Sequence, residues 1–370
     1  MKKILSIIIL MLIIINTTVL AEEHIEPIME KAIVLEAGEA QEKDEFGEYV
    51  QTQEVTLKIT SGKYKDKIVD IENDLSDNMA YNIFVKEGDK VVIAIEEIAD
   101  GEYNINIADY QRADFILYLI ILFVALILIV GRMKGLKSII SLSLTIGAVF
   151  YILLPQILKG ANPVPISILI SIGVTIITIF LVSGVNNKSI AAILGTSSGV
   201  IIAGIISYYV GSKIHLTGLS AEEATMLMYI PQEIEFDFKN LLFAGIILGS
   251  LGAVMDVGMS IASSIEEIHS ANNNLSRKEL FKSGMNVGKD VMGTMTNTLI
   301  LAYTGSSIPL LLLFMAYETS LIKIMNLDVI ATEVIRSLSG SIGLVLTIPI
   351  TALIASVLTK KVRGEDIKNE

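Results

Sequence analysis

The chain has 370 residues, of which 52% are apolar and only 18% are charged, with a formal net charge of −12. Since about a quarter of the residues in soluble domains are charged, this composition indicates a membrane protein. No cysteine is present, which excludes disulfides, thiolate metal sites and cysteine nucleophiles.

The negative charge is confined to one part of the chain. Residues 22–114 carry 24 Asp or Glu against 9 Lys or Arg, whereas residues 115–370 carry 16 against 17. This asymmetry divides the chain into an acidic, water-soluble part and a nearly neutral, apolar part. A nucleic-acid partner is not expected, because no basic face is available to neutralise phosphates.

The first 21 residues are organised like a secretory signal. Lys2 and Lys3 precede an unbroken apolar run, residues 4–15, and Val19-Leu20-Ala21 fits a cleavage site. We expect residues 1–21 to be a signal peptide cleaved after Ala21, with an uncleaved signal anchor as the alternative. Either reading places the chain from residue 22 onward outside the cytoplasm.

Residues 22–112 are expected to form an exported, acidic, β-rich domain. Alternation over residues 54–60 places Val55, Leu57 and Ile59 on one face of a strand. Further strands are predicted at 68–71, 81–85 and 91–95, with turns at 61–63 and 87–89. Short strands with glycine turns favour a small barrel of the OB type or a compact sandwich. The carboxylates lack EF-hand spacing, so we expect a solvated acidic surface and assign no metal.

Residues 113–359 are predicted to form a transmembrane helical bundle, followed by a cytoplasmic tail at 360–370, so the fold class is mainly α. A span needs about 20 mostly apolar residues. The seven predicted spans are Phe115–Val130, Ser138–Leu154, Ile166–Ser183, Ile190–Val210, Leu241–Ala262, Val291–Met315 and Leu338–Leu358.

Positive charge predicts the orientation of the bundle. Lysine and arginine concentrate in the connections 131–137, 184–189 and 263–290 and in the tail, as expected for cytoplasmic loops. We therefore expect a bacterial-type cytoplasmic membrane protein with residues 22–112 outside and the C-terminus in the cytoplasm.

Two connections contain capping boxes. Ser276 and Glu279 predict a cytoplasmic helix of a few turns that ends near residue 284 or 288. Ser220 and Glu223 predict a second short helix on the outer side.

Three runs in the last third of the chain combine glycine and polar residues within apolar sequence. They are residues 249–262 (GSLGAVMDVGMSIA), 288–299 (GKDVMGTMTNTL) and 336–344 (RSLSGSIGL). These runs resemble the YibE/F family of bacterial multi-pass membrane proteins. The resemblance implies an exported β-rich segment before the helices and a transporter role of unassigned substrate, and it brings no catalytic residue.

One carboxylate falls inside a predicted span. Asp256 at bilayer depth costs about 2.5 kcal/mol or more, so it should face protein or water. Asn297 and Thr294 on the next, antiparallel span reach a similar depth, and Ser260 lies one turn from Asp256. These four residues predict a polar cluster that binds a cation or proton along a transport path. The alternative is a structural hydrogen bond that fastens two helices.

Two further features concern the ends and the packing of the spans. Arg336, at the start of the last span, is predicted to pair with Glu318, either as an outer gate or as residues that snorkel to the headgroups. Small residues at helical spacing predict close helix packing, and Pro309 and Pro349 predict kinks.

Two classes of function remain. An enzyme is not expected, because HExxH and Walker motifs are missing, and no cofactor is assigned. The first class is a secondary transporter or permease of unknown substrate. The second is a non-transporting membrane scaffold or sensor whose exported domain binds a partner. The expected partners are the lipid bilayer and an ion or small solute, with a homo-oligomer or a partner membrane protein left open.

Overall fold

The computed structural model describes residues 27–45, 48–75, 82–97, 103–230, 235–318 and 320–359. The predicted signal peptide and cytoplasmic tail lie outside these residues. The chain divides into two compact units with a boundary between Phe123 and Val124. Each unit has its own hydrophobic core.

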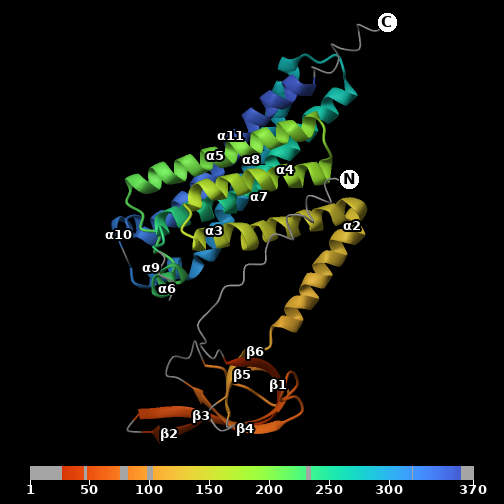
Figure 1. The fold of residues 1–370 in the computed structure, drawn as a ribbon. Coiled ribbons are helices and arrows are strands. Elements are labelled where there is room, and N and C mark those ends of the chain that lie inside the picture. The colour runs from red at the N-terminus through yellow and green to blue at the C-terminus, as the bar shows by residue number, and fades with distance from the viewer. Residues whose placement is uncertain are drawn as a thin grey trace. The chain divides into compact units, whose positions relative to one another are not determined.

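The first unit is a six-stranded antiparallel sheet that curls into a nearly closed barrel (Figure 1). The strands are β1 (Ile28–Ala37), β2 (Gln41–Glu45), β3 (Glu48–Ile59), β4 (Ile68–Leu75), β5 (Lys90–Glu97) and β6 (Tyr103–Tyr110). They are ordered β2-β3-β1-β5-β6, and β4 also pairs with β3. A small antiparallel barrel is therefore confirmed, with β1, β2 and β6 added to the strands predicted from the sequence.

The barrel core has the predicted alternation. Val55, Leu57 and Ile59 of β3 are buried, as are alternate apolar residues of β5. Gly62 and Gly88 occupy the two predicted turns with φ angles of 68° and 87°. This left-handed region favours glycine because it has no Cβ.

The predicted strand at 81–85 is wrong over its described residues, 82–85, which form no strand. Buried Gln53 on β3 donates a hydrogen bond from Nε2 to the Val85 carbonyl (2.8 Å) and accepts one from the Val85 N–H (3.2 Å). Asn73 on β4 donates to the Ile83 carbonyl at 2.8 Å. Side-chain amides thus satisfy backbone groups that a neighbouring strand would otherwise pair.

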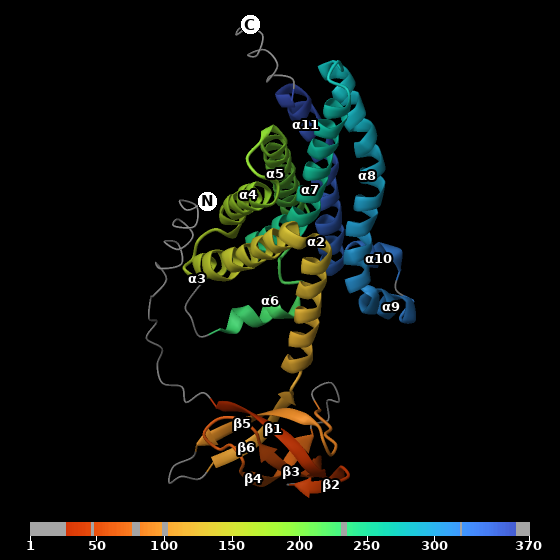
Figure 2. The same ribbon diagram turned by 90° about the vertical axis from the view of Figure 1, so that its right-hand side faces the viewer.

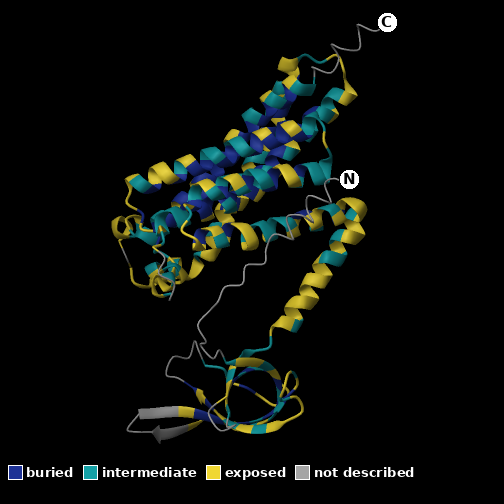
Figure 3. Ribbon diagram, in the orientation of Figure 1, coloured by how far each residue is buried: buried dark blue, intermediate teal, exposed yellow. Residues whose placement is uncertain are grey.

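The second unit begins inside helix α2 (Ala113–Ala148) and is helical. In chain order the helical elements are α2 (Ala113–Ala148), η2 (Val149–Leu153), α3 (Leu154–Leu158), α4 (Pro163–Ser183), α5 (Asn187–Lys213), α6 (Glu222–Met226), η3 (Leu227–Tyr229), α7 (Phe238–Ala271), α8 (Arg277–Ser306), α9 (Ile308–Ala316), α10 (Leu321–Met325) and α11 (Asp328–Thr359). Figure 2 shows the long helices α7, α8 and α11 side by side. Helix α7 packs against α4, α5, α8 and α11. Buried residues concentrate where α5, α7 and α11 meet (Figure 3).

Five helical segments in the described residues are long and apolar enough to cross a membrane, or six if the bent pair α8–α9 is one span. The predicted count of seven differs because the first two predicted spans fall within a single run of 46 residues, Ala113–Leu158. At 1.5 Å per residue this run measures about 69 Å, about twice the thickness of a bilayer's hydrocarbon core.

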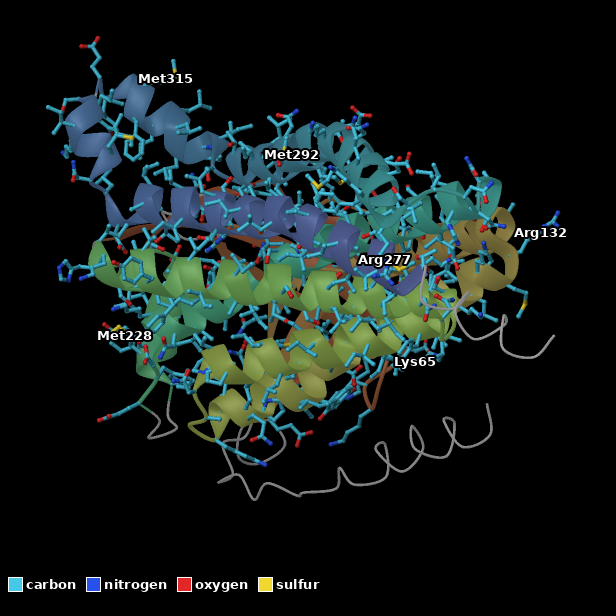
Figure 4. The ribbon with its side chains drawn as sticks, turned by 90° about the horizontal axis from the view of Figure 1, so that it is seen from above. Lys65, Arg132, Met228, Arg277, Met292 and Met315 are labelled. Atoms are coloured by element: carbon cyan, nitrogen blue, oxygen red, sulfur yellow. The ribbon has the colours of Figure 1, made fainter. Side chains whose placement is uncertain are left out.

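This long run is broken within the predicted 131–137 connection. Arg132 has a non-helical conformation (φ 46°, ψ −126°), and it is labelled at the bend in Figure 4. Past the bend, a Cβ on Gly135 would lie 2.2 Å from the Ile127 carbonyl oxygen. Glycine therefore permits the close approach of the chain on the two sides of Arg132.

The predicted span Val291–Met315 is bent. Helices α8 and α9 meet at 60° across Ser307, next to Pro309 at the start of α9. Figure 4 shows the run, with Met292 between Arg277 and Met315. The kink predicted from Pro309 is thus confirmed, whereas α11 continues as a helix through Pro349.

The two capping boxes have different outcomes. Ser276 and Glu279 form the predicted box, but α8 continues to Ser306, so the predicted end at 284–288 is wrong. Gly284 and Gly288 do not end the helix, because they face isoleucine side chains that a Cβ would approach to 2.6 Å and 2.1 Å. The outer box is not formed, since α6 begins without a side-chain cap.

Candidate polar site on α7 and α8

Asp256 and Ser260 lie on one exposed face of α7. The opposite face is buried in the bundle through residues such as Val254, Val257 and Ile261. Exposed positions recur every three or four residues along α7 at Gly245, Gly249, Gly252, Asp256 and Ser260. Such spacing places them on one helix face, which therefore consists of small and polar residues.

The exposed face of α8 is also polar. Gly293, Thr294, Asn297 and Thr298 are exposed. The Thr294 hydroxyl donates to the Val291 carbonyl of its own helix at 3.0 Å, and the Thr298 hydroxyl donates to the Thr294 carbonyl at 2.9 Å. Of these four residues, Asn297 is the one whose polar side chain makes no hydrogen bond among the described residues.

Packing contacts fix the register of the antiparallel helices α7 and α8. Gly288 of α8 faces Ile261 of α7, and Tyr303 faces Gly249. Asp256 lies five residues from the first α7 contact and seven from the second. Because the helices are antiparallel, the level of Asp256 on α8 is five residues after Gly288, at 293, or seven residues before Tyr303, at 296. Asp256 therefore lies within about one helical turn of the level of Asn297.

The four side chains of the predicted cluster share this region but are not bonded to one another. Among the described residues, no hydrogen bond or ion pair joins Asp256, Ser260, Thr294 and Asn297, and the Asp256 carboxylate has no partner. The structural alternative, in which these residues fasten α7 to α8, requires a bond that this arrangement does not contain. The polar groups are instead presented outward from the helix pair.

The predicted pair between Glu318 and Arg336 is not formed. Arg336 Nη1 lies 3.2 Å from Glu333 Oε1, one turn earlier on α11. Glu318 is exposed in the turn that follows α9, with a φ of 47°. A partner three residues away on the same helix is positioned by the helix itself, whereas Glu318 lies outside this helix, in the turn after α9.

The interface between α5 and α11 contains polar residues that were not predicted as a site. A Cβ on Gly195 would lie 1.8 Å from Thr351 Oγ1, and a Cβ on Gly199 would lie 1.8 Å from Thr347 Oγ1. Thr347 donates to the Gly343 carbonyl at 2.9 Å, whereas the Thr351 hydroxyl is buried without a partner. The four-residue spacing of the two threonines was the available sequence signal. This interface is filled, which favours a packing role.

Two hollows of the second unit lie elsewhere. One, of about 210 Å³, is lined by residues that include Asn162, Glu235 and Asp237. The other, of about 310 Å³, is an apolar groove along α5 and α11. Neither is lined by the predicted cluster. Within the part of the chain that the structure describes, no group of three His, Asp or Glu residues is placed to hold a metal ion.

The β unit has an aromatic and basic patch at the loop between β3 and β4. The rings of Tyr64 and Tyr103 lie 5.3 Å apart, and Lys67 Nζ lies 4.7 Å and 5.2 Å from their centroids. Glu97 accepts hydrogen bonds from Lys63 and Tyr64, both at 2.7 Å. The hydrogen bond from Lys63 has the larger effect and that from Tyr64 the next, and both lower the pKa of the Glu97 carboxyl and keep it ionised.

The apolar helices and the separate antiparallel barrel define a helical membrane protein with an N-terminal β domain. The family profile described as YibE/F-like protein matches residues 119–361, and that described as YibE/F family N-terminal domain matches residues 27–110. The chain belongs to the YibE/F family. No curated protein and no solved structure matches it.

Proposed function

We propose that this YibE/F-family protein is a permease in which the polar face of α7 and α8 lines a path for a proton or another cation. The observation that carries the proposal is the unpartnered Asp256 carboxylate on the exposed face of an apolar helix. An ionised carboxylate cannot remain in hydrocarbon without water or protein around it. A hydrated carboxylate in turn attracts cations, and the oxygens of Ser260 and Asn297 are further ligands.

The orientation of the path follows from the positive charge. Lys134 and Lys137 follow the bend at Arg132, and placing this bend in the cytoplasm gives seven spans with the β domain outside. Lys188 and Glu266, which form an ion pair of 2.6 Å near the ends of α5 and α7, then lie on the same cytoplasmic side. The residues at the level of Asp256 belong to the inner half of the membrane.

A flux assay tests this function. The purified protein is reconstituted into liposomes that contain dyes for H⁺, Na⁺ or K⁺, and a gradient of each ion is imposed. The wild type is expected to dissipate at least one gradient faster than empty liposomes, and Asp256→Asn should reduce this rate at least about tenfold, or about 1.4 kcal/mol.

Glu267→Gln is the matched control, because Glu267 lies on the exposed side of the same helix but near its end. It should retain the wild-type rate. A wild type that moves none of the three ions, or an Asp256→Asn variant as fast as the wild type, would overturn the proposed path.

The second candidate is a sensor or scaffold whose β domain binds a partner. The aromatic and basic patch of Tyr64, Lys67 and Tyr103 favours it, because such surfaces bind ligands through ring faces and cations. Tyr64→Ala combined with Tyr103→Ala distinguishes the two functions. Under the permease proposal, the double variant keeps its ion flux. Under the sensor proposal, neither the wild type nor the variant shows ion flux, and the variant loses every cellular phenotype of the gene.

A further inference from the structure

The outward-facing glycines of α7 and α8 are not explained by contacts among the described residues. A Cβ on Gly245, Gly252 or Gly293 would meet nothing within 4 Å. On the same two helices, a Cβ on Gly258 or Gly288 would approach other atoms to 2.5 Å and 2.1 Å. Glycine inside a helix is about 1 kcal/mol less favourable than alanine. Gly258 and Gly288 permit packing that offsets this cost, whereas Gly245, Gly252 and Gly293 gain no packing from the described part of the chain.

The same outer face carries the unpartnered polar groups. Asp256 follows Gly252 by one turn on α7, and Asn297 follows Gly293 by one turn on α8. Outward glycines let another backbone approach closely, and an unpaired carboxylate and amide require hydrogen-bond partners in a membrane. Both observations indicate that another helix covers this face.

We infer that the covering helices belong to a second copy of the chain, in a two-fold dimer whose axis runs along the membrane normal. In such a dimer the two copies lie at the same depth. Asp256 of each copy is then level with the partner's Asn297, because the two residues lie within about one turn of the same level in one chain. The carboxylate accepts a hydrogen bond and the amide donates one, so the face is complementary to itself and forms two identical contacts.

This inference extends the proposed function and rests on it, because the site concerned is the same polar face of α7 and α8. The polar site is incomplete in one chain, because Asp256 has an acceptor group and no donor. A second copy completes it, so the ion path runs between the copies, and each copy contributes one Asp256 and one Asn297.

Disulfide cross-linking tests the dimer, and the absence of native cysteine makes each introduced thiol unique. One copy carries Ser260→Cys and the other carries Gly293→Cys, with different affinity tags, and both are co-expressed and oxidised in membranes. Both positions are exposed, and they lie at about the same depth on α7 and α8. Because each chain has a single cysteine, a dimer-sized band with both tags can arise only between copies. We expect this band for the mixture.

Leu169→Cys on α4 is the control, since this side chain is 68% exposed and lies on another helix. Its mixture with Gly293→Cys should give no such band. The inference is overturned if the Ser260→Cys and Gly293→Cys mixture gives no mixed band, or if both mixtures give it equally through random collision. The cross-linking result is separate from the flux assay. A cross-linked dimer without ion flux would contradict the proposed function and support the dimer. Ion flux without cross-linking would support the proposed function and contradict the dimer.

Discussion

Two glycine-rich helix faces in the same bundle have opposite surroundings. At the α5–α11 interface, Gly195 and Gly199 are covered by Thr351 and Thr347 of the facing helix. On the α7–α8 face, no atom of a described residue other than the immediate neighbours lies within 4 Å of the position of a Cβ on Gly245 or Gly252. Small residues that recur on one helix face therefore indicate close approach in both places, but among the described residues only the first approach is completed.

The largest expected effect comes from adding a side-chain atom at the α5–α11 interface. Gly199→Ala would place Cβ 1.8 Å from Thr347 Oγ1 and 2.8 Å from the Gly343 carbonyl oxygen. Overpacking of this kind should lower the free energy of unfolding by about 3 kcal/mol. Thermal unfolding of the purified protein in detergent measures the loss. Gly252→Ala is the control, and it should leave the monomer unchanged or stabilise it by up to about 1 kcal/mol. Equal losses for both variants would remove the distinction between the two faces.

A larger side chain on the exposed α7–α8 face should weaken dimer formation without changing the stability of the monomer. Gly252→Ile puts a branched side chain where the partner's backbone is expected, once in each copy. The dissociation constant of the dimer should rise about thirtyfold, or about 2 kcal/mol, while the unfolding of the monomer stays close to wild type. Energy transfer between labelled copies at varied protein-to-lipid ratios measures this constant. An unchanged constant would show that residue 252 faces lipid.

Removing the predicted donor should have a smaller effect. Asn297→Val deletes the amide that is expected to donate a hydrogen bond to the partner's Asp256, and interhelical hydrogen bonds in membranes contribute about 0.6 kcal/mol each on average. With two such bonds in a two-fold dimer, the dissociation constant should rise nearly tenfold in the same measurement. Thr298→Val serves as its control, since that hydroxyl already donates to its own helix. A Thr298→Val effect as large as that of Asn297→Val would argue against a specific role for the amide.

The smallest effect is expected for removal of a buried hydroxyl at the α5–α11 interface. Thr351→Val should change stability by less than about 0.5 kcal/mol, because the Thr351 hydroxyl is buried without a partner. Thr347→Val should cost about 1 kcal/mol, because that hydroxyl donates to the Gly343 carbonyl at 2.9 Å. Chemical denaturation of both variants in detergent gives the comparison. A large loss for Thr351→Val would indicate a hydrogen bond, such as one to water, within the α5–α11 interface.

Local sequence signals predicted the elements whose cause is local. The alternation of Val55, Leu57 and Ile59 predicted a buried strand face, and Ser276 with Glu279 predicted the start of α8. The predicted spans for α4, α5, α7 and α11 lie within the observed helices, because hydropathy alone identifies a segment of bilayer length.

Long-range contacts explain the predictions that were wrong. Residues 82–85 have the pattern of a strand, but the side chain of Gln53 on β3 takes the place of a strand partner. Gly284 and Gly288 suggested a helix end, yet the neighbouring helices require small residues there. Arg336 was assigned to Glu318, although Glu333 is nearer along the helix. For the candidate site, the sequence supplied the four residues and their depth, but not their outward presentation.

The most direct test of the account is the environment of residue 256 in the membrane. A spin label attached at Asp256→Cys reports its collisions with oxygen, which concentrates in lipid, and with a water-soluble nickel complex. The account predicts low oxygen and high nickel collision relative to a label at Leu353→Cys, a side chain that is 57% exposed on α11. Oxygen collision as high as at residue 353, with no nickel collision, would place Asp256 in lipid and contradict both the path and the dimer.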